Sequence, residues 1–366
     1  MAEIPEPCAN PELFAQEAAL AVLQQSMSSG RLHHAWLFTG PPGIGKATLA
    51  YRFARALLAG ADQVDARLAL DPDHPVFRQV AQGAHPDLQV IKSEQDARGR
   101  IKAEITVDLV RQATTRMQTT AAMGGWRVLL VDGAERFNRS AGNALLKLLE
   151  EPPADTVIIL ISHRPAQVLP TLRSRCTRLA LTRLPDGVVA EGLARWAPDV
   201  DAADRTAVAA LARGSLGRAL QLATENGLML YRRLLANVSR DPPERLALRD
   251  LALDLQRHAD AHGMTAVLAL IQDLLARVIA AASGRPAAPL FPEELVQVEG
   301  LARRRPLDHW PALWEKFDRL ATAVDRLNLD RGQAFAHILT LLALGSAGDG
   351  NGPADLAPLG AFDVLA

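Results

Sequence analysis

The sequence predicts an α/β domain with a parallel sheet covered by helices, followed by a small helical domain and an all-α C-terminal domain. Short apolar runs alternate with helical stretches as far as Leu181, which favours a parallel sheet buried on both faces. A glycine-rich loop follows the first of these runs and leads into a helix. After Leu181 the chain is rich in Ala and Leu, and we expect no strand there.

The composition is that of an ordinary globular protein with more than one hydrophobic core. The 366 residues exceed the usual size of a single core. Apolar residues make up 49% of the chain and charged residues 22%. The net charge of −1 and the 4% aromatic content argue against an autonomous DNA-binding protein. A local basic patch for DNA stays compatible with these values.

Cysteine content and the first residues predict a cytoplasmic protein. Cys8 and Cys176 are too few for a four-cysteine zinc site or a disulfide framework. The N-terminal residues are acidic and interrupted by prolines, unlike a signal peptide. We expect no apolar run that reaches the length of a membrane span, and therefore no membrane partner.

The first half of the chain contains all the predicted strands. Asn10, Pro11 and Glu12 indicate a helix start, with a cap, a proline in the first turn and an acid. Residues 35–39 form the strand before the glycine-rich loop, and residues 49–58 after it have helical periodicity. Further buried strands are predicted at 88–91, 127–132, 157–162 and 178–181.

Helices alone are predicted in the second half. Leu184-Pro185-Asp186 marks a boundary and a helix start. The predicted helical segments are 187–196, 202–212, 217–235, 244–260, 264–282, 292–303, 308–325 and 331–344. We divide the chain into domains at 1–182, 183–240 and 241–345, followed by a flexible tail at 346–366.

The loop Gly40-Pro41-Pro42-Gly43-Ile44-Gly45-Lys46 has the composition and the strand–helix context of a phosphate-binding P-loop. Its glycines let backbone N–H groups face a phosphate, and Lys46 adds a point charge. A Ser or Thr normally follows the lysine and binds Mg²⁺ through its hydroxyl. Here Ala47 follows, and Thr48 is rotated by about 100° around the helix. The loop predicts a site for ATP or ADP and leaves magnesium binding open.

An acidic residue ends a second apolar strand, as in a Walker B motif. The strand is Val128–Asp132, and Asp132 could hold a metal ion through water. An acid at the end of a strand can also cap a helix. The P-loop in the same chain favours the nucleotide-site interpretation.

Further motifs resemble those of clamp-loader subunits of the AAA+ ATPases. Asn143-Ala144-Leu145-Leu146-Lys147-Leu148-Leu149-Glu150-Glu151-Pro152-Pro153 looks like their helix-and-turn signature, and Leu172-Arg173-Ser174-Arg175-Cys176 resembles their Ser-Arg-Cys motif. His33–Phe38, before the P-loop, has the same look. Singly, these motifs could be an amphipathic helix, a surface arginine and a buried cysteine. Their order and spacing over residues 10–220 favour the family.

The resemblance implies that nucleotide hydrolysis by this chain is absent or very weak. Hydrolysing AAA+ members usually carry Glu directly after the Walker B Asp, where this chain has Gly133. Glu135 lies two residues further and need not point to the same place. Our best match to the sensor 2 helix places Gly217 where the motor subunits carry a sensing arginine.

The resemblance also implies a role for Arg175 in a neighbouring site. In this family the arginine of Ser-Arg-Cys reaches across a subunit interface as an arginine finger, a planar cation placed against the γ-phosphate. Ser162, with His163 as second choice, matches sensor 1. Many relatives insert a four-cysteine zinc module after the P-loop helix, but residues 62–86 contain no cysteine, so we expect no zinc.

The family implies a structural subunit of the pentameric bacterial DNA polymerase III clamp loader, which places a sliding clamp on primed DNA. Its partners would be gamma or tau and delta subunits, with residues 183–240 as the lid and 241–345 as the oligomerisation collar. The alternative is an active motor ATPase of the gamma/tau type, against which Ala47, Gly133 and Gly217 argue. The sequence leaves open nucleotide occupancy, DNA-contacting residues, subunit order and the role of residues after Gly345.

Overall fold

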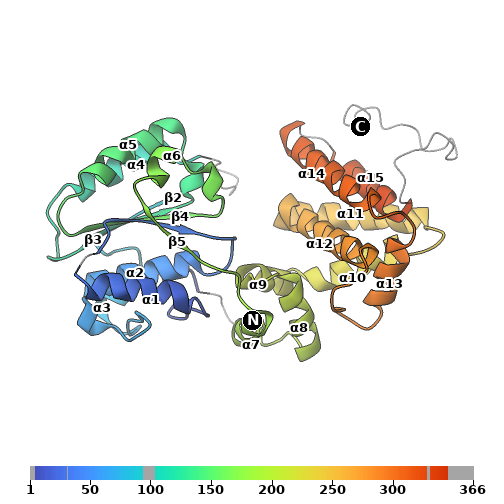
Figure 1. Ribbon diagram of the computed structural model, residues 1–366, viewed down its shortest axis with the longest axis horizontal. Helices are drawn as coiled ribbons and strands as arrows, with labels where there is room; N and C mark the ends of the chain where they lie inside the picture. The colour runs from blue at the N-terminus through green and yellow to red at the C-terminus, as the bar shows by residue number, and fades with distance from the viewer. Residues whose placement is uncertain (1–4, 31, 94–103, 328–329, 345–366) are drawn as a thin grey trace. The chain divides into compact units, whose positions relative to one another are not determined.

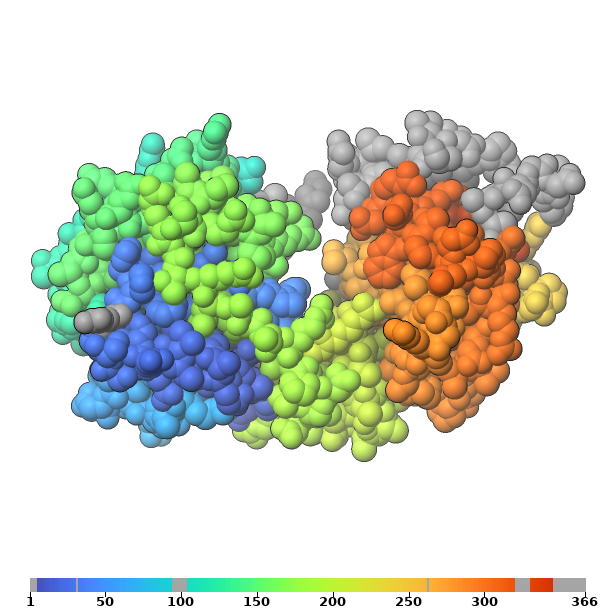
Figure 2. All heavy atoms as spheres, in the orientation of Figure 1, coloured from blue at the N-terminus to red at the C-terminus, as the bar shows by residue number. Residues whose placement is uncertain are grey.

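The computed structural model describes residues 5–30, 32–93, 104–327 and 330–344 of the chain. It divides into two compact units, which are described separately. The first comprises residues 1–201 and 212–220, and the second residues 202–211 and 221–366. In the space-filling view, the first unit runs mainly from blue to green and the second mainly from yellow to orange (Figure 2). The predicted tail at 346–366 lies outside the described residues, and the three-domain division stays a prediction.

A five-stranded parallel sheet forms the centre of the first unit, in the strand order β2-β3-β4-β1-β5. The predicted fold class is therefore confirmed, and the strand predicted at 127–132 has the predicted bounds. The apolar runs form these strands because neighbouring strands and covering helices remove them from water. The strands are β1 (Ala35–Thr39), β2 (Leu88–Lys92), β3 (Arg127–Asp132), β4 (Thr156–Ser162) and β5 (Thr177–Ala180).

Helices cover both faces of this sheet (Figure 1). One face is covered by α1 (Glu17–Ser28) and α2 (Lys46–Ala59), with α3 (Pro75–Ala81) beside them. The other is covered by α4 (Val107–Met117), α5 (Arg139–Glu150) and α6 (Pro170–Arg173). The remaining elements of this unit are the short 3-10 helices η1 (Ala61–Gln63), η2 (Ala134–Arg136) and η3 (Pro165–Gln167), and α7 (Asp186–Trp196).

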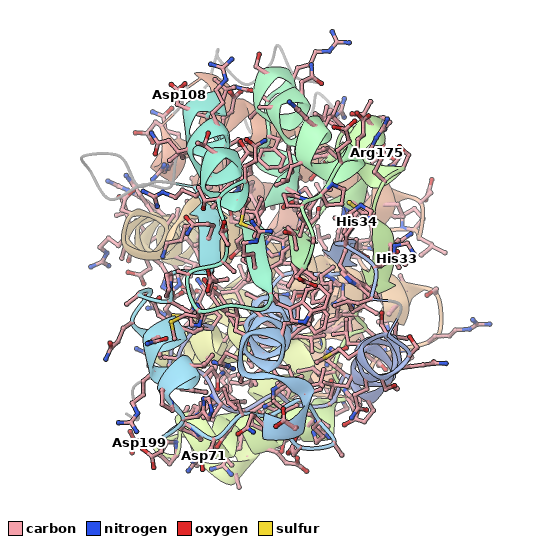
Figure 3. All side chains as sticks on the ribbon, turned by 90° about the vertical axis from the view of Figure 1, so that its left-hand side faces the viewer. His33, His34, Asp71, Asp108, Arg175 and Asp199 are labelled. Atoms are coloured by element: carbon pink, nitrogen blue, oxygen red, sulfur yellow. The ribbon has the colours of Figure 1, made fainter. Side chains whose placement is uncertain are left out.

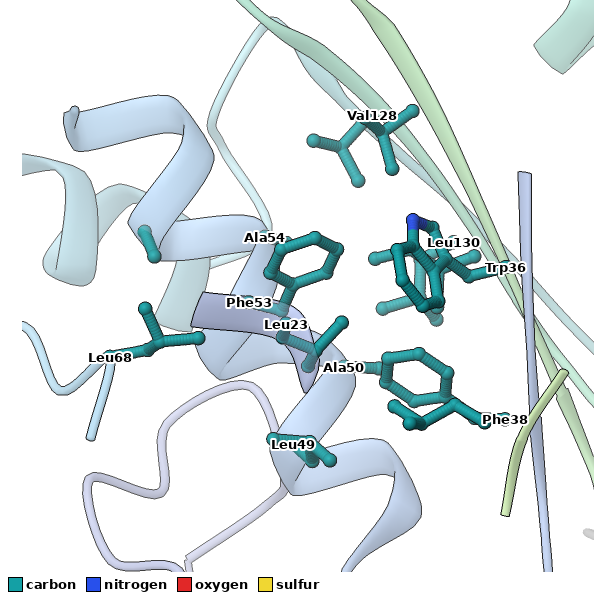
Figure 4. Close-up of a cluster of buried hydrophobic side chains, with 14 of the residues drawn as sticks. Leu23, Trp36, Phe38, Leu49, Ala50, Phe53, Ala54, Leu68, Val128 and Leu130 are labelled. Carbon is teal, nitrogen blue, oxygen red and sulfur yellow. The ribbon is translucent and has the colours of Figure 1, made fainter. Parts of the chain in front are cut away.

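Alternating side chains of the strands divide the core into two layers, because successive strand residues point to opposite faces. Trp36 and Phe38 of β1 pack with Phe53 of α2 in one layer (Figure 4). Ala35 and Leu37 of the same strand belong to the other layer, with residues of α4 and α5. The loop that follows β1 is thus attached to a strand that is buried on both sides.

The second unit contains helices, and no strand occurs among its described residues. Its core includes a buried ion pair, in which Arg277 Nε lies 2.7 Å from Glu294 Oε1. The Tyr231 hydroxyl donates to the same carboxylate oxygen at 2.7 Å. The helices are α8 (Ala202–Leu211), α10 (Gly227–Val238), α11 (Arg245–His262), α12 (Met264–Ala282), α13 (Glu294–Ala302), α14 (His309–Leu327) and α15 (Arg331–Leu344), while α9 (Leu216–Thr224) spans the division.

The helix predicted to start at Asn10 is wrong, because α1 begins at Glu17. Ala15 and Gln16 have left-handed φ angles of 53° and 69°, which interrupt a helix at this point. The Asn10 side chain still accepts a hydrogen bond, from the Glu12 backbone N–H at 2.8 Å, but it stabilises a local turn.

Arginine side chains hold the backbone of this N-terminal segment, residues 8–15. Arg55 is 1% exposed and donates to the carbonyls of Cys8 at 2.8 Å and Asn10 at 2.9 Å. Arg52 donates to the Pro11 carbonyl, and Arg67 donates to the carbonyls of Leu13 and Ala15 at 3.2 and 3.3 Å. The buried guanidinium groups thereby gain acceptors, and the non-helical carbonyls gain donors.

The single helix predicted at 217–235 is two helices, α9 and α10. Asn226 lies between them with a left-handed φ of 55°, a conformation that Asn tolerates better than most residues. The helices α3 and α4 lie between predicted strands, where helical stretches were expected but no bounds were predicted. At α3, the His74 ring accepts the Val76 N–H and Pro75 takes the first helical position.

The expectation that no segment reaches membrane-span length is wrong for α12. This helix is long and apolar enough to cross a membrane by length and composition alone. Its buried side chains include Leu270, Leu274 and Leu275, each at most 1% exposed within the helical unit. Burial on one side by α11, α13 and α14 accounts for a composition that water would otherwise disfavour.

Candidate functional site

The predicted nucleotide-site residues lie at the carboxyl ends of neighbouring strands. Thr39, the last residue of β1, is opposite Ser162, the last residue of β4. Asp132 ends β3 and is opposite Ile161 of β4. The sheet therefore brings the P-loop, Asp132 and Ser162 to one edge, where ligands of open α/β sheets usually bind.

The P-loop turns directly from β1 into α2. Gly43 has a left-handed φ of 73°, and a Cβ atom added there would lie 2.3 Å from Ser215 Oγ. Gly45 precedes the first residue of α2, Lys46, with a left-handed φ of 97°. The predicted strand, loop and helix are thus present, and glycine is required by both conformation and space.

The start of α9 packs against this loop through its backbone. Ser215 Oγ donates to the Pro42 carbonyl at 2.9 Å, and the Gly217 N–H donates to the Gly43 carbonyl at 2.9 Å. A Cβ added at Gly217 would lie 2.9 Å from Gly43 Cα. The residue that we matched to the sensor 2 arginine is therefore a glycine because two backbones meet there.

Lys46 is directed into the loop itself. Its side chain is 3% exposed and Nζ donates to the Pro41 carbonyl. Burial lowers the pKa of Lys46 to about 8, although the charges of Asp132 and Glu135 act in the opposite direction. In this arrangement the residues do not fit a bound phosphate. Lys46 must leave the Pro41 carbonyl before its charge can meet a phosphate.

The first turn of α2 shows how the metal-binding position differs from a complete P-loop. Ala47 and Thr48 are both partly buried. The residue directly after Lys46 supplies no hydroxyl, and the helix turns Thr48 to another side.

Glu135 joins the site, although no sequence pattern placed it there. Gly133 turns the chain with a left-handed φ of 94°, and η2 brings Glu135 back toward the end of β4. Glu135 Oε1 accepts the His163 N–H at 3.2 Å. Burial raises the pKa of Glu135, but hydrogen bonds from its own N–H, the Ser162 hydroxyl and the His163 N–H outweigh burial and lower the pKa overall. The hydroxyl of Ser162, the sensor 1 candidate, is thus engaged in a hydrogen bond to Glu135.

His163, the second choice for sensor 1, borders the same group. Burial and then the charge of Lys46 lower the pKa of His163, which favours its neutral form. Its Nδ1 atom and Glu135 Oε2 are buried without a hydrogen-bond partner. Lys46, Asp132, Glu135 and His163 therefore interact electrostatically as one cluster beneath the loop.

Gln16 also contacts the site and was not recognised from the sequence. Its side chain is 6% exposed and donates to the carbonyls of Ile44 at 3.2 Å and Thr182 at 2.9 Å. Near it, Phe14 and Trp196 form an edge-to-face pair with ring centroids 5.2 Å apart. The segment before α1 is thereby attached to both the P-loop and α7. The left-handed turn at Ala15 and Gln16 directly precedes α1 at this point, and no sequence pattern indicated it.

Arg175 is outside this group and points to the surface. It follows α6, and Figure 3 labels it together with His34. Its Nη2 atom lies 2.6 Å from Glu150 Oε1, and Nη1 donates to the Thr171 carbonyl at 3.0 Å. The side chain is 37% exposed. Cys176 next to it is half-buried, and burial raises the pKa of its thiol to about 12, as for a small packing residue.

Known proteins resemble the half of the chain that carries this site. The family model described as "DNA polymerase III, delta subunit" matches residues 15–185. DNA polymerase III subunit delta' of Pseudomonas aeruginosa is 40% identical over 182 residues, or 50% of this chain and 53% of that protein. Its Escherichia coli K12 counterpart is 36% identical over 203 residues, or 55% and 57%.

A subunit with another name is also similar. DNA polymerase III subunit tau of Salmonella typhimurium is 35% identical over 178 residues, which cover 48% of this chain and 26% of that protein. The chain thus spans about half the length of the delta' relatives named above, and less of tau.

Proposed function

We propose that this chain is a non-hydrolysing, structural subunit of a clamp loader, because residues 15–185 match the family model of the DNA polymerase III delta subunit and delta' subunits are 36–40% identical to about half of the chain. It assembles with gamma or tau and delta subunits in the cytoplasm. The complex uses ATP bound by its other subunits to place a sliding clamp on primed DNA. This chain contributes a fixed body and an arginine finger.

The observation that carries the proposal is the engagement of Lys46 with the Pro41 carbonyl. A lysine that is 3% exposed and bonded within its own loop offers little charge to a nucleotide. Ala47 and Gly133 remove two further groups that hydrolysis needs, the metal-binding hydroxyl and the acid after Asp132. We expect ATP or ADP to bind only if Lys46 leaves the Pro41 carbonyl.

The arginine finger is the catalytic contribution that we assign to this chain. Arg175 is exposed enough to meet a neighbouring subunit, in contrast to Lys46. Its guanidinium is planar, permanently charged and able to donate to two phosphate oxygens at once. Such a cation stabilises the charge that develops on the transferring γ-phosphate of a partner's nucleotide.

The alternative is an active motor subunit, and two observations favour it. The tau relative matches nearly the same share of this chain as delta' does. Glu135 also lies beside Ser162, and both Glu135 and Asp132 act on the charge of Lys46, so a second acid is present in the site. A motor would hydrolyse ATP as an isolated chain, whereas the structural subunit would not.

The test compares the isolated chain with the reconstituted loader. We expect no measurable turnover by the isolated chain, and DNA-dependent ATPase by the complex. Arg175→Ala should lower the ATPase of the complex by on the order of 10³-fold, with assembly unchanged by gel filtration. Arg173→Ala, two residues away and also exposed, is the matched control and should retain activity.

Two results would contradict the proposal. ATP turnover by the isolated chain at the rate of the complex would support the motor alternative. Full ATPase in a correctly assembled Arg175→Ala complex would remove the arginine finger.

A further inference from the structure

We infer that Glu150 is a positioning residue for Arg175, which sets the direction of the guanidinium before a partner nucleotide is met. This inference rests on the proposed function of Arg175. The ion pair joins two segments of the chain, the end of α5 and the turn after α6. The ion pair also joins two motifs that are separate in the sequence, the helix-and-turn signature and the Ser-Arg-Cys motif.

The location of Glu150 is unfavourable for the helix that carries it. Glu150 is the last residue of α5, where the helix dipole places partial negative charge. A cation such as Lys147, in the same turn, is the favourable residue type at this end. Helix stability therefore does not account for a carboxylate at this position. The ion pair of Glu150 with Arg175, at 2.6 Å, accounts for the carboxylate at this position.

Two anchors fix the guanidinium from different sides. Glu150 accepts at Nη2, and the Thr171 carbonyl accepts at Nη1. A free arginine side chain has many rotamers, and immobilising one on binding costs conformational entropy. The two contacts restrict these rotamers in advance, while the fork of five donors still has N–H groups for phosphate oxygens.

The anchors themselves are attached to the core. Leu148 and Leu149, next to Glu150, are each 2% exposed, and a ring nitrogen of His34 lies 2.9 Å from the Leu149 carbonyl. Leu172, next to Thr171, is fully buried. Glu150 itself is 49% exposed, so its removal should affect the stability of the fold very little. A rigid base with an exposed contact is the arrangement that a positioning role requires.

The experiment is a double-mutant cycle in the reconstituted loader. Glu150→Ala should lower the kcat of the DNA-dependent ATPase about tenfold, with KM for ATP and the melting temperature unchanged. Glu150→Gln retains one acceptor and should lose less. Glu151→Ala, at the adjacent exposed position, is the matched control and should behave like the wild type.

The cycle gives a readout that a merely structural role would not change. In the Arg175→Ala background, adding Glu150→Ala should have no further effect, because there is no guanidinium left to position. Independent, additive losses would overturn the inference, as would an unchanged or increased kcat for Glu150→Ala alone. If Arg175→Ala itself is fully active, the proposed function fails first and the inference fails with it.

Discussion

The P-loop and the turn after α6 each carry a cation suited to phosphate, Lys46 and Arg175. The two cations differ in burial and in their hydrogen-bond partners. Lys46 is almost completely buried and donates to a carbonyl of its own loop. Arg175 is exposed and held by a carboxylate and a carbonyl that leave part of its donor fork free. The difference supports the proposal that the P-loop serves the fold of this chain and that Arg175 acts on a nucleotide held by another subunit.

The sharpest test of this contrast, beyond the losses expected at Arg175 and Glu150, is Lys46→Met. A buried charged lysine with a lowered pKa disfavours the folded state, so replacing it should stabilise the protein. The depression from 10.5 to about 8 sets an upper bound of about 3 kcal/mol at pH 7. Chemical denaturation measures the gain, and the exposed Lys147→Met is the control, with about 0.5 kcal/mol or less expected.

The same variant should retain the ATPase of the reconstituted loader if the P-loop is structural. A large loss of ATPase in the Lys46→Met complex would break the comparison, because the loop would then serve a nucleotide after all.

The gain from Lys46→Met should depend on pH in a defined window. Below about pH 8 the lysine is charged in both the folded and the unfolded protein, so the full penalty is present. Between pH 8 and the ordinary pKa of 10.5 the folded protein releases its proton first, and the penalty fades. The difference in unfolding free energy between variant and wild type should therefore shrink over this window. A constant difference would show that Lys46 is not charged and buried as described.

A smaller effect is expected where α9 meets the loop. Gly217→Ala places a Cβ against the Gly43 backbone, which cannot give way easily, so it should destabilise the protein by about 1–3 kcal/mol. Gly187→Ala in α7 adds a Cβ where nothing lies within 4 Å, and helix propensity predicts a gain of up to about 1 kcal/mol. Equal unfolding midpoints for the two variants would show that α9 does not press on the loop.

The strands were predictable because their signal is local. Residues 127–132 are an apolar run bounded by charged residues, and the sheet buries that run whatever its neighbours are. The order of strands and loops then placed Lys46, Asp132 and Ser162 at one edge. Much of the fold and the core of the candidate site therefore followed from short stretches of sequence.

Contacts between distant segments could not be predicted in the same way. Gly133 is one of many glycines, and nothing in the sequence shows that its left-handed φ of 94° accompanies the turn that brings Glu135 to Ser162. In the sequence, Gly217 only marked the absence of the sensor 2 arginine. The structure shows in addition that its backbone contacts the backbone of Gly43. Sequence patterns report burial and periodicity, but they do not report which remote backbone a residue will touch.

The arginines of α2 and of the segment after it recognise the N-terminal segment by its carbonyl groups alone. Every amino acid offers a carbonyl, so mutations in residues 8–15 can accumulate without loss of the hydrogen bonds from Arg52, Arg55 and Arg67. Selection would then act on the backbone path and length of residues 8–15, and on the three arginines. It would act much less on which amino acids the segment contains. Relatives could share this structural element while their alignments show no similarity there.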